Sequence, residues 1–245
     1  MTSLTEKSIQ IQIRLIPHLI RELLQRPPDK DYRIQKPLFF KSDDFKQNFL
    51  NPEEFQRLNQ FKALKKQVEW LCGRFSAKAA AQELLMPDQR LDGVQIDYME
   101  QGAPYIVAFP NHCLSLSHSG IYTAAAVAME PGILTGIDIE ALGPRPDHHF
   151  MKTAFTDKEI RHLGPSARDV FQCWTQKEAY LKYIRMGFNE SLHQVEIING
   201  RIYHRGVERD LDCRSWDLDQ GYIMSGVFPP GTVVQLSIKL KPSKS

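Results

Sequence analysis

Two acidic residues stand one position apart in the run Gly136-Ile137-Asp138-Ile139-Glu140. A β-strand turns alternate side chains to opposite faces, so the carboxylates of Asp138 and Glu140 would project side by side while the isoleucines face a core. Neighbouring carboxylates repel each other unless a cation compensates, and their hard oxygen atoms suit Mg²⁺. A solvated strand face is the competing interpretation of this run.

A third acidic residue lies on the apolar side of an expected helix. In the run WTQKEAYLK, Glu178 stands between Trp174 and Leu181 at helical steps of four and three, so it shares their core-directed face. An ordinary ion pair with Lys182 would contribute only about 0.2–0.5 kcal/mol on an exposed helix. That pair would not explain the apolar neighbours, so we favour a functional role for Glu178.

Basic residues gather on one face of another expected helix, over residues 62–85. Arg74 and Lys78 are like charges at i,i+4, which destabilises a helix unless an anion lies between them. Together with Lys65 and Lys66 they form a set that could hold phosphate groups. A solvated helix face is the more common reason for such a pattern.

The run SLSHS closes an expected strand at a turn. Its hydroxyl groups, imidazole and backbone N–H groups are suited to meeting a phosphate, and Ser117 and His118 are the candidates that we single out. A serine-hydrolase site is not indicated, because no GxSxG elbow is present. A histidine at a turn without any ligand role is the competing interpretation of His118.

The elements that must position these residues can be read from local signals. A helix is predicted to begin after Asn51, because Pro52 and Glu54 complete a capping-box pattern. Residues 1–50 carry only a possible short strand or helix around residues 9–24. Three strand-like runs follow the basic helix and are read as an antiparallel meander: residues 113–117, 121–129 and 133–140.

The second half of the chain repeats this order. Residues 156–185 are predicted to be helical, and Asn199-Gly200 is a hairpin signal. Further strands are expected near Trp216 and over residues 222–228 and 233–240. Each half therefore reads as helix followed by sheet.

Composition narrows the class of protein. The 245 residues are 42% hydrophobic and 24% charged, which is typical of one large or two small globular domains. A net charge of +2 does not indicate a nucleic-acid partner. The four cysteines are far apart, without metal-site or disulfide-scaffold spacing. Polar residues interrupt the apolar amino terminus before it reaches signal-peptide or membrane-span length, so we expect a soluble, cytoplasmic protein without a membrane partner.

The motifs together resemble the 4′-phosphopantetheinyl transferase superfamily, in its long, monomeric branch typified by surfactin- and enterobactin-pathway activating enzymes. The resemblance rests on five runs in a fixed order: WLCGRFSAK, SLSHS, GIDIE, FTDKE and WTQKEAYLK. It implies an α+β fold of two similar α/β subdomains related by a pseudo-twofold, each with a long helix packed on a small, mainly antiparallel sheet. The subdomains would span residues 1–134, with 1–50 as a poorly defined extension, and 135–245.

The resemblance also implies roles for the candidate residues. Asp138, Glu140 and Glu178 would coordinate Mg²⁺ together with coenzyme A, and Lys182 and His118 would contact its phosphate groups. Catalysis would depend on Glu178, Lys182 and Asp138.

The adenosine 3′-phosphate of coenzyme A would be received by Lys66 and Arg74, with Ser117 lining the same pocket. Many relatives have a Gly-Lys-Pro turn whose lysine touches the nucleotide, whereas this chain has Gly102-Ala103-Pro104. Nucleotide binding would then depend more on the basic helix.

By this resemblance the reaction is transfer of the 4′-phosphopantetheine group of coenzyme A to a serine of an apo acyl or peptidyl carrier protein, giving the holo-carrier protein and adenosine 3′,5′-bisphosphate. A noncatalytic module that binds coenzyme A or a carrier protein is one alternative. A metal-dependent phosphodiesterase is another, and it would cleave coenzyme A without any acceptor protein.

Overall fold

The first sheet takes its strands from both ends of the chain. The computed structural model describes residues 7–28 and 35–239, and there the strand order is β12-β1-β5-β4. Its members are β1 (Ser8–Leu15), β4 (Leu114–Ser119), β5 (Tyr122–Ala128) and β12 (Val233–Lys239). β1 runs parallel to β12 and antiparallel to β5. Residues 1–50, in which the sequence showed no motif, thus supply an inner strand, followed by α1 (Ile16–Leu23).

The second sheet is antiparallel and has the order β10-β11-β6. It consists of β6 (Gly136–Ala141), β10 (Asp212–Leu218) and β11 (Tyr222–Phe228). The expected meander is therefore only partly right. β4 and β5 do pair, but β6 pairs with β11, because β1 and β4 already occupy both edges of β5.

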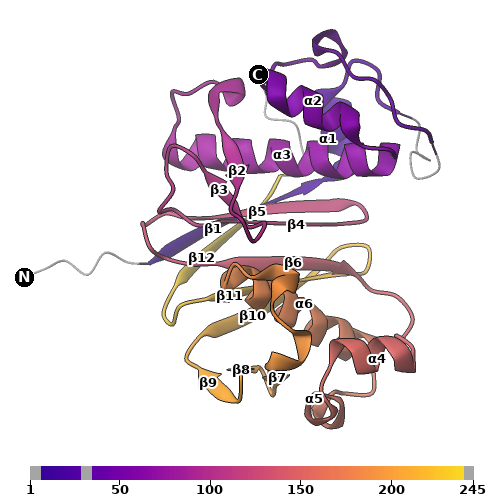
Figure 1. Cartoon of the computed structure of the whole chain (residues 1–245), viewed down its shortest axis with the longest axis vertical. Coiled ribbons are helices and arrows are strands. Elements are labelled where there is room, and N and C mark those ends of the chain that lie inside the picture. Colours follow the sequence, from indigo (N-terminus) through magenta and orange to yellow (C-terminus); the bar gives the residue numbers. More distant parts are fainter. Residues whose placement is uncertain (1–6, 29–34, 240–245) are drawn as a thin grey trace, which may run out of the picture.

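Two long helices cover the outer faces of these sheets (Figure 1). α3 (Leu64–Leu85) packs on the first sheet through small residues, with Ala77, Ala80 and Ala81 in one buried cluster with Ala125 and Val127. α6 (Ala167–Tyr183) packs on the second sheet. A buried apolar cluster lies between the two sheets and includes Ile11, Ile13, Ile137, Ile139 and Met224. The described chain is thus a mixed α+β structure.

A ladder of serine hydroxyl groups joins the edges of the two sheets. Every second residue of β4 accepts a hydrogen bond from a backbone N–H of β6: Ser115 from Ile137 (3.0 Å), Ser117 from Ile139 (3.1 Å) and Ser119 from Ala141 (3.3 Å). The ladder fixes the register of β6 against β4. It therefore places the acidic residues of β6 relative to the SLSHS motif.

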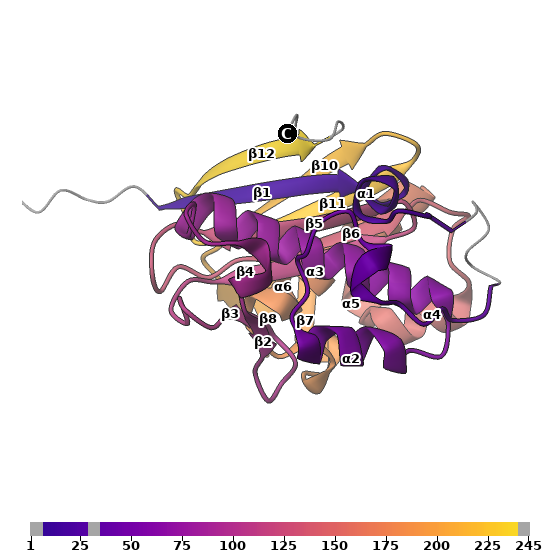
Figure 2. The same ribbon diagram turned by 90° about the horizontal axis from the view of Figure 1, so that it is seen from above.

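Shorter elements complete the molecule. They are α2 (Pro52–Gln60), α4 (His148–Ala154), α5 (Asp157–His162), the hairpin of β2 (Ile96–Tyr98) and β3 (Pro104–Ile106), and the sheet of β7 (Val195–Ile198), β8 (Arg201–His204) and β9 (Val207–Arg209). Single 3₁₀ turns lie at Ser42–Asp44, Leu91–Gly93, Gly187–Asn189 and Leu192–Gln194. Seen from above, the β2–β3 hairpin and the strands β1 and β12 lie on opposite sides of α3 (Figure 2).

Most local predictions are confirmed in this fold. The capping box of Asn51 and Glu54 starts α2, and the hairpin at Asn199-Gly200 joins β7 and β8 with positive φ angles of 51° and 76°. The predicted helix over residues 156–185 divides into α5 and α6 around Pro165, because proline removes a backbone donor. Leu240, at the end of the last expected strand, lies outside the described residues. Within the described part of the chain, no helix has the length and apolar character of a membrane span.

Candidate active site

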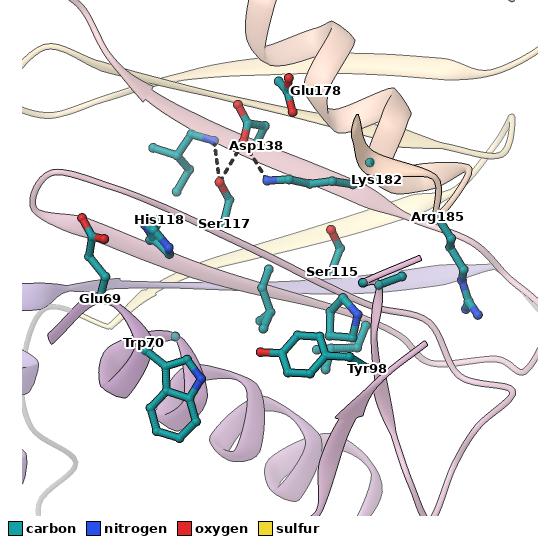
Figure 3. A pocket seen from close by; sticks show the side chains of 18 of the residues that line it. Glu69, Trp70, Tyr98, Ser115, Ser117, His118, Asp138, Glu178, Lys182 and Arg185 are labelled. Carbon is teal, nitrogen blue, oxygen red and sulfur yellow. Dashed lines mark hydrogen bonds and ion pairs between the residues drawn. The ribbon is translucent and has the colours of Figure 1, made fainter. Parts of the chain in front are cut away.

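A cavity of about 510 Å³ lies where α3, β4, β6, α6 and the β2–β3 hairpin meet. Figure 3 shows side chains from these elements pointing into it. Lys65, Lys66 and Lys78 do not line it, whereas the other candidate residues from the sequence do: Arg74, Ser117, His118, Asp138, Glu140, Glu178 and Lys182. The structure thus brings together motifs that are far apart in the chain.

Close contact between β6 and α6 places the acidic residues. A β-carbon added to Gly136 would lie 2.0 Å from the carbonyl oxygen of Ala179, so only glycine allows the helix to lie this near the strand. Asp138 and Glu140 follow on alternate positions of the same face. The isoleucines between them are buried in the cluster between the sheets, which confirms the predicted alternation.

Asp138 accepts hydrogen bonds from two neighbouring elements, β4 and α6. It is 6% exposed, and its Oδ1 atom accepts hydrogen bonds from Ser117 Oγ (2.9 Å) and Lys182 Nζ (2.7 Å). Lys182 therefore pairs with Asp138 across two elements, rather than with Glu178 along its own helix. The simple helix-surface ion pair considered from the sequence is not what the structure contains.

The other two carboxylates repel Asp138 and each other. Burial, followed by the charge of Asp138, raises the pKa of Glu178 to about 7. The same two causes raise the pKa of Glu140. Glu140 accepts hydrogen bonds from Trp174 Nε1 and Ser119 Oγ, both at 3.3 Å. The cavity thus concentrates negative charge that Lys182 alone does not balance.

Two buried oxygen atoms at this point have no hydrogen-bond partner: Asp138 Oδ2 and Glu178 Oε1. Buried carboxylate oxygens without partners are costly, and hard oxygen donors are what Mg²⁺ prefers. The donor set of Asp138, Glu140 and Glu178 therefore fits a divalent cation chemically. As the side chains stand, no three His, Cys, Asp or Glu residues within 7–28 and 35–239 are gathered closely enough to form a metal site.

His118 and Ser117 lie beside the acidic residues. Desolvation in the cavity lowers the pKa of the His118 imidazole, although the residue is exposed at the surface and the charge of Glu69 acts in the opposite direction. The Ser117 hydroxyl group accepts a hydrogen bond from the backbone of Ile139 and donates one to Asp138, which leaves one acceptor lone pair. Its established contacts hold β4, β6 and Asp138 together.

The basic face of α3 is only partly what the sequence suggested. Lys78 is completely buried and donates to Glu54 and to the carbonyl oxygen of Phe49 (2.8 Å). Arg74 Nε lies 3.6 Å from Glu54. An anion does separate these two like charges, but it is the protein's own Glu54, so the expectation of a phosphate at Lys78 is wrong.

Arg74 and Lys66 occupy different surroundings. The Arg74 guanidinium lines the cavity, stacks over Trp70 and Tyr98 at 5.1 and 5.4 Å, and donates to a backbone carbonyl. The Lys66 side chain is 63% exposed and bonds Glu69 (3.0 Å). Lys66 does not line the cavity, although Glu69 does, so its part in phosphate binding stays a prediction.

Several lining residues had no sequence signal that would have identified them. Tyr98 and Glu69 reach the cavity because α3 and the β2–β3 hairpin converge on it. Arg185 lies just beyond α6, where the sequence marked only the end of a helix. Their common feature is tertiary proximity, which no local spacing encodes.

Comparison with known proteins decides the family. Residues 135–227 match the family model of the 4′-phosphopantetheinyl transferase superfamily. A holo-[acyl-carrier-protein] synthase of Streptococcus suis is 33% identical over 96 residues, which are 37% of this chain and 80% of the relative. The chain belongs to the 4′-phosphopantetheinyl transferase superfamily.

Longer members of this superfamily match more of the chain. The 4′-phosphopantetheinyl transferase ffp of Bacillus subtilis is 26% identical over 201 residues, 72% of this chain and 86% of the relative. The transferase Sfp of Bacillus subtilis strain 168 is 22% identical over 205 residues, 78% of this chain and 88% of the relative. The predicted membership in the long branch is confirmed, and all three acidic residues lie in the segment that matches the superfamily model.

Proposed function

We propose that this protein transfers the 4′-phosphopantetheine group of coenzyme A to a serine of an apo acyl or peptidyl carrier protein. The products are the holo-carrier protein and adenosine 3′,5′-bisphosphate. The single observation that carries the proposal is the pair of buried, partnerless oxygens, Asp138 Oδ2 and Glu178 Oε1, on a cavity that Lys182 also lines. This arrangement suits a ligand that brings both phosphate groups and a cation.

Asp138, Glu140 and Glu178 would hold Mg²⁺. When bound, the ion supplies charge neutralisation for the diphosphate of coenzyme A. It would also relieve the repulsion that raises the pKa values of Glu140 and Glu178.

The chain's own residues have three tasks in the transfer. Lys182 offsets negative charge on the diphosphate, and His118, Ser117, Arg74 and Lys66 bind the nucleotide part. Glu178 takes the proton from the hydroxyl group of the carrier serine, directly or through water. The serine oxygen forms a bond to the β-phosphorus, and the bond from that phosphorus to the bridging oxygen breaks, so the bisphosphate leaves with the electron pair.

We also propose that the two sheet-and-helix units are subdomains related by a pseudo-twofold, with the boundary near residue 134. The buried lysines Lys78 of α3 and Lys177 of α6 support this proposal, because each donates to the third residue of a neighbouring short helix, Glu54 of α2 and Glu159 of α5. β12 would then be an element that the second subdomain contributes to the first sheet. We expect a cytoplasmic monomer, whose oligomeric state light scattering coupled to gel filtration would measure.

The test is incubation of the protein with coenzyme A, Mg²⁺ and several apo-carrier proteins, followed by intact-mass analysis. We expect one carrier to gain the mass of one phosphopantetheine group, with release of adenosine 3′,5′-bisphosphate. Chelation of divalent ions should stop the reaction, and added Mg²⁺ should restore it.

The same assay separates the alternatives. Cleavage of coenzyme A in the absence of any apo-carrier would indicate a phosphodiesterase. Binding of coenzyme A without cleavage or transfer, across a broad carrier panel, would indicate a noncatalytic module and would refute the proposed reaction.

A further inference from the structure

One basic side chain on the cavity wall has no part in the site described so far. Arg185 follows α6 and lines the cavity together with Gly187 and the turn between β2 and β3. In Figure 3 it lies on the opposite side of the cavity from Glu69 and His118. It therefore presents positive charge far from the basic end of α3.

The backbone at Arg185 is of the kind that normally requires glycine. Its φ angle is +58°, in the left-handed region that disfavours residues with a β-carbon. The N–H of Arg185 donates to the carbonyl oxygen of Lys182 (3.0 Å), and that of Met186 donates to Leu181 (3.2 Å). These two bonds form a Schellman motif, which usually has glycine at the position of Arg185. A large side chain in a strained position on a cavity wall indicates a role for that side chain.

Among the described residues, no carboxylate pairs with the charge of Arg185. The other strongly basic residues of the cavity wall are paired, Lys182 with Asp138 and Arg74 with Glu54. Within the described part of the chain, the polar contact of Arg185 is Nη1 to the Met99 sulfur at 3.6 Å, and sulfur is a weak acceptor. A guanidinium free of carboxylates is suited to bidentate binding of a phosphate group.

The segment that carries Arg185 is tied to the opposite wall. Asn189 Nδ2 donates to the carbonyl oxygen of Gln101 (3.3 Å) and to that of Met186 (3.0 Å). These bonds join the chain after α6 to the turn of the β2–β3 hairpin. The backbone segment that carries Arg185 is thereby held in place, which lowers the entropy cost of ordering it when a ligand binds.

We propose that Arg185 is a phosphate-binding residue of the cavity, and that it holds a phosphate group of coenzyme A. The proposal rests on the proposed function for the identity of the ligand. Coenzyme A offers two sources of the same chemistry, the 3′-phosphate and the diphosphate. Dephospho-coenzyme A lacks only the first and therefore distinguishes them.

The experiment measures coenzyme A affinity by calorimetry for the wild type, Arg185→Gln and Arg185→Gly, together with thermal unfolding. The matched control is Gln220→Gly, which replaces another residue of positive φ (62°) with glycine, in the β10–β11 turn and outside the cavity lining. We expect both Arg185 variants to bind coenzyme A about 10- to 100-fold more weakly. Arg185→Gly should unfold at the wild-type temperature or above, because glycine relieves the strain. Gln220→Gly should bind normally.

Comparing coenzyme A with dephospho-coenzyme A shows which phosphate group Arg185 binds. A loss with coenzyme A that disappears with dephospho-coenzyme A identifies the 3′-phosphate, and an equal loss with both identifies the diphosphate. Wild-type affinity in Arg185→Gln and Arg185→Gly would overturn the proposal.

Transfer to apo-carrier, measured on the same wild-type preparation, keeps the two proposals apart. A protein that transfers but whose affinity does not depend on Arg185 refutes only the Arg185 assignment. A protein that binds coenzyme A through Arg185 but transfers nothing refutes only the proposed reaction. A wild type that binds neither coenzyme A nor dephospho-coenzyme A refutes both.

Discussion

The two long helices are held by buried lysines that are placed alike, yet only in α6 is the lysine followed directly by an acidic residue. In the first half, Lys78 of α3 is fully buried and donates to Glu54 and to the carbonyl oxygen of Phe49. Glu54 is the third residue of α2, whose N-cap is Asn51. The lysine thus ties α3 to the start of a neighbouring short helix.

The second half repeats this anchor position for position. Lys177 of α6 is fully buried and donates to Glu159 (2.6 Å) and to the carbonyl oxygen of Ala154 (2.8 Å). Glu159 is the third residue of α5, whose N-cap is Thr156. In both anchors the accepting carbonyl lies two residues before the N-cap.

The helices differ at the residue that follows the lysine. In α3 it is Ala79, which packs into an apolar cluster, and in α6 it is Glu178, which faces the cavity. An anchor that fixes the helix also fixes the direction of the next side chain. The comparison indicates that the anchor is structural in both halves and that α6 adds an acidic residue to a position already held rigid.

The strongest test of this contrast replaces the acidic residue alone. Glu178→Gln keeps the shape of the side chain and removes its charge, so transfer should fall by about 10²- to 10⁴-fold, the range for loss of a general base. The matched control is Glu83→Gln on α3. Glu83 accepts a hydrogen bond from Gln12 (2.9 Å) and lies outside the cavity lining, so this variant should leave the rate of transfer unchanged. Full transfer by Glu178→Gln at saturating Mg²⁺ and coenzyme A would remove Glu178 from the mechanism.

Removing the buried lysine should destabilise the protein more in the second half than in the first. Lys177→Met leaves Glu159, which is completely buried, without its cation, at a cost of about 3–5 kcal/mol of unfolding free energy. Lys78→Met should cost less, about 1–3 kcal/mol, because Arg74 still lies 3.6 Å from Glu54. Urea unfolding of both variants measures the difference, and equal losses would contradict the compensation by Arg74.

Local patterns predicted the parts of this comparison that depend on neighbours in the sequence. The capping box at Asn51 and the alternation of Asp138 with isoleucines follow from backbone geometry alone, and both are present. The family resemblance then identified Glu178 and Lys182 as members of the same site. They meet Asp138 because α6 packs against β6.

The features that sequence reasoning missed depend on partners from distant segments. The sequence places Lys78 on a basic, phosphate-binding face, since nothing in its helix shows that Glu54 lies within reach. The spacing of Trp70, Arg74 and Lys78 in the sequence equals that of Trp174, Glu178 and Lys182, which aligns Lys78 with Lys182. In the structure Lys78 instead corresponds to Lys177, because each donates to a glutamate and to a backbone carbonyl oxygen. The pairing of β6 with β11 rather than β5 is non-local for the same reason.

Glycine substitutions test, with a smaller expected effect, how closely each half packs its helix. Gly136→Ala would press a methyl group into the backbone of α6, so we expect a loss of about 1–3 kcal/mol in stability. Gly73 of α3 has no atom within 4 Å of an added β-carbon, and Gly73→Ala should stabilise the helix by up to about 1 kcal/mol. Thermal unfolding of both variants tests the opposite signs, and stabilisation by Gly136→Ala would refute the close approach.

The N-caps provide the finest test of how alike the anchors are. Asn51→Ala should cost about 1 kcal/mol, because its side chain accepts the N–H of Glu54 (2.9 Å). Thr156→Ala should cost somewhat more, because the Thr156 hydroxyl caps Glu159 and also donates to Glu196 (2.9 Å). Thr156→Ser keeps both bonds and serves as the control. Urea unfolding measures the loss of unfolding free energy in each variant. A larger loss for Asn51→Ala than for Thr156→Ala would contradict a stabilising contribution from the bond between Thr156 and Glu196.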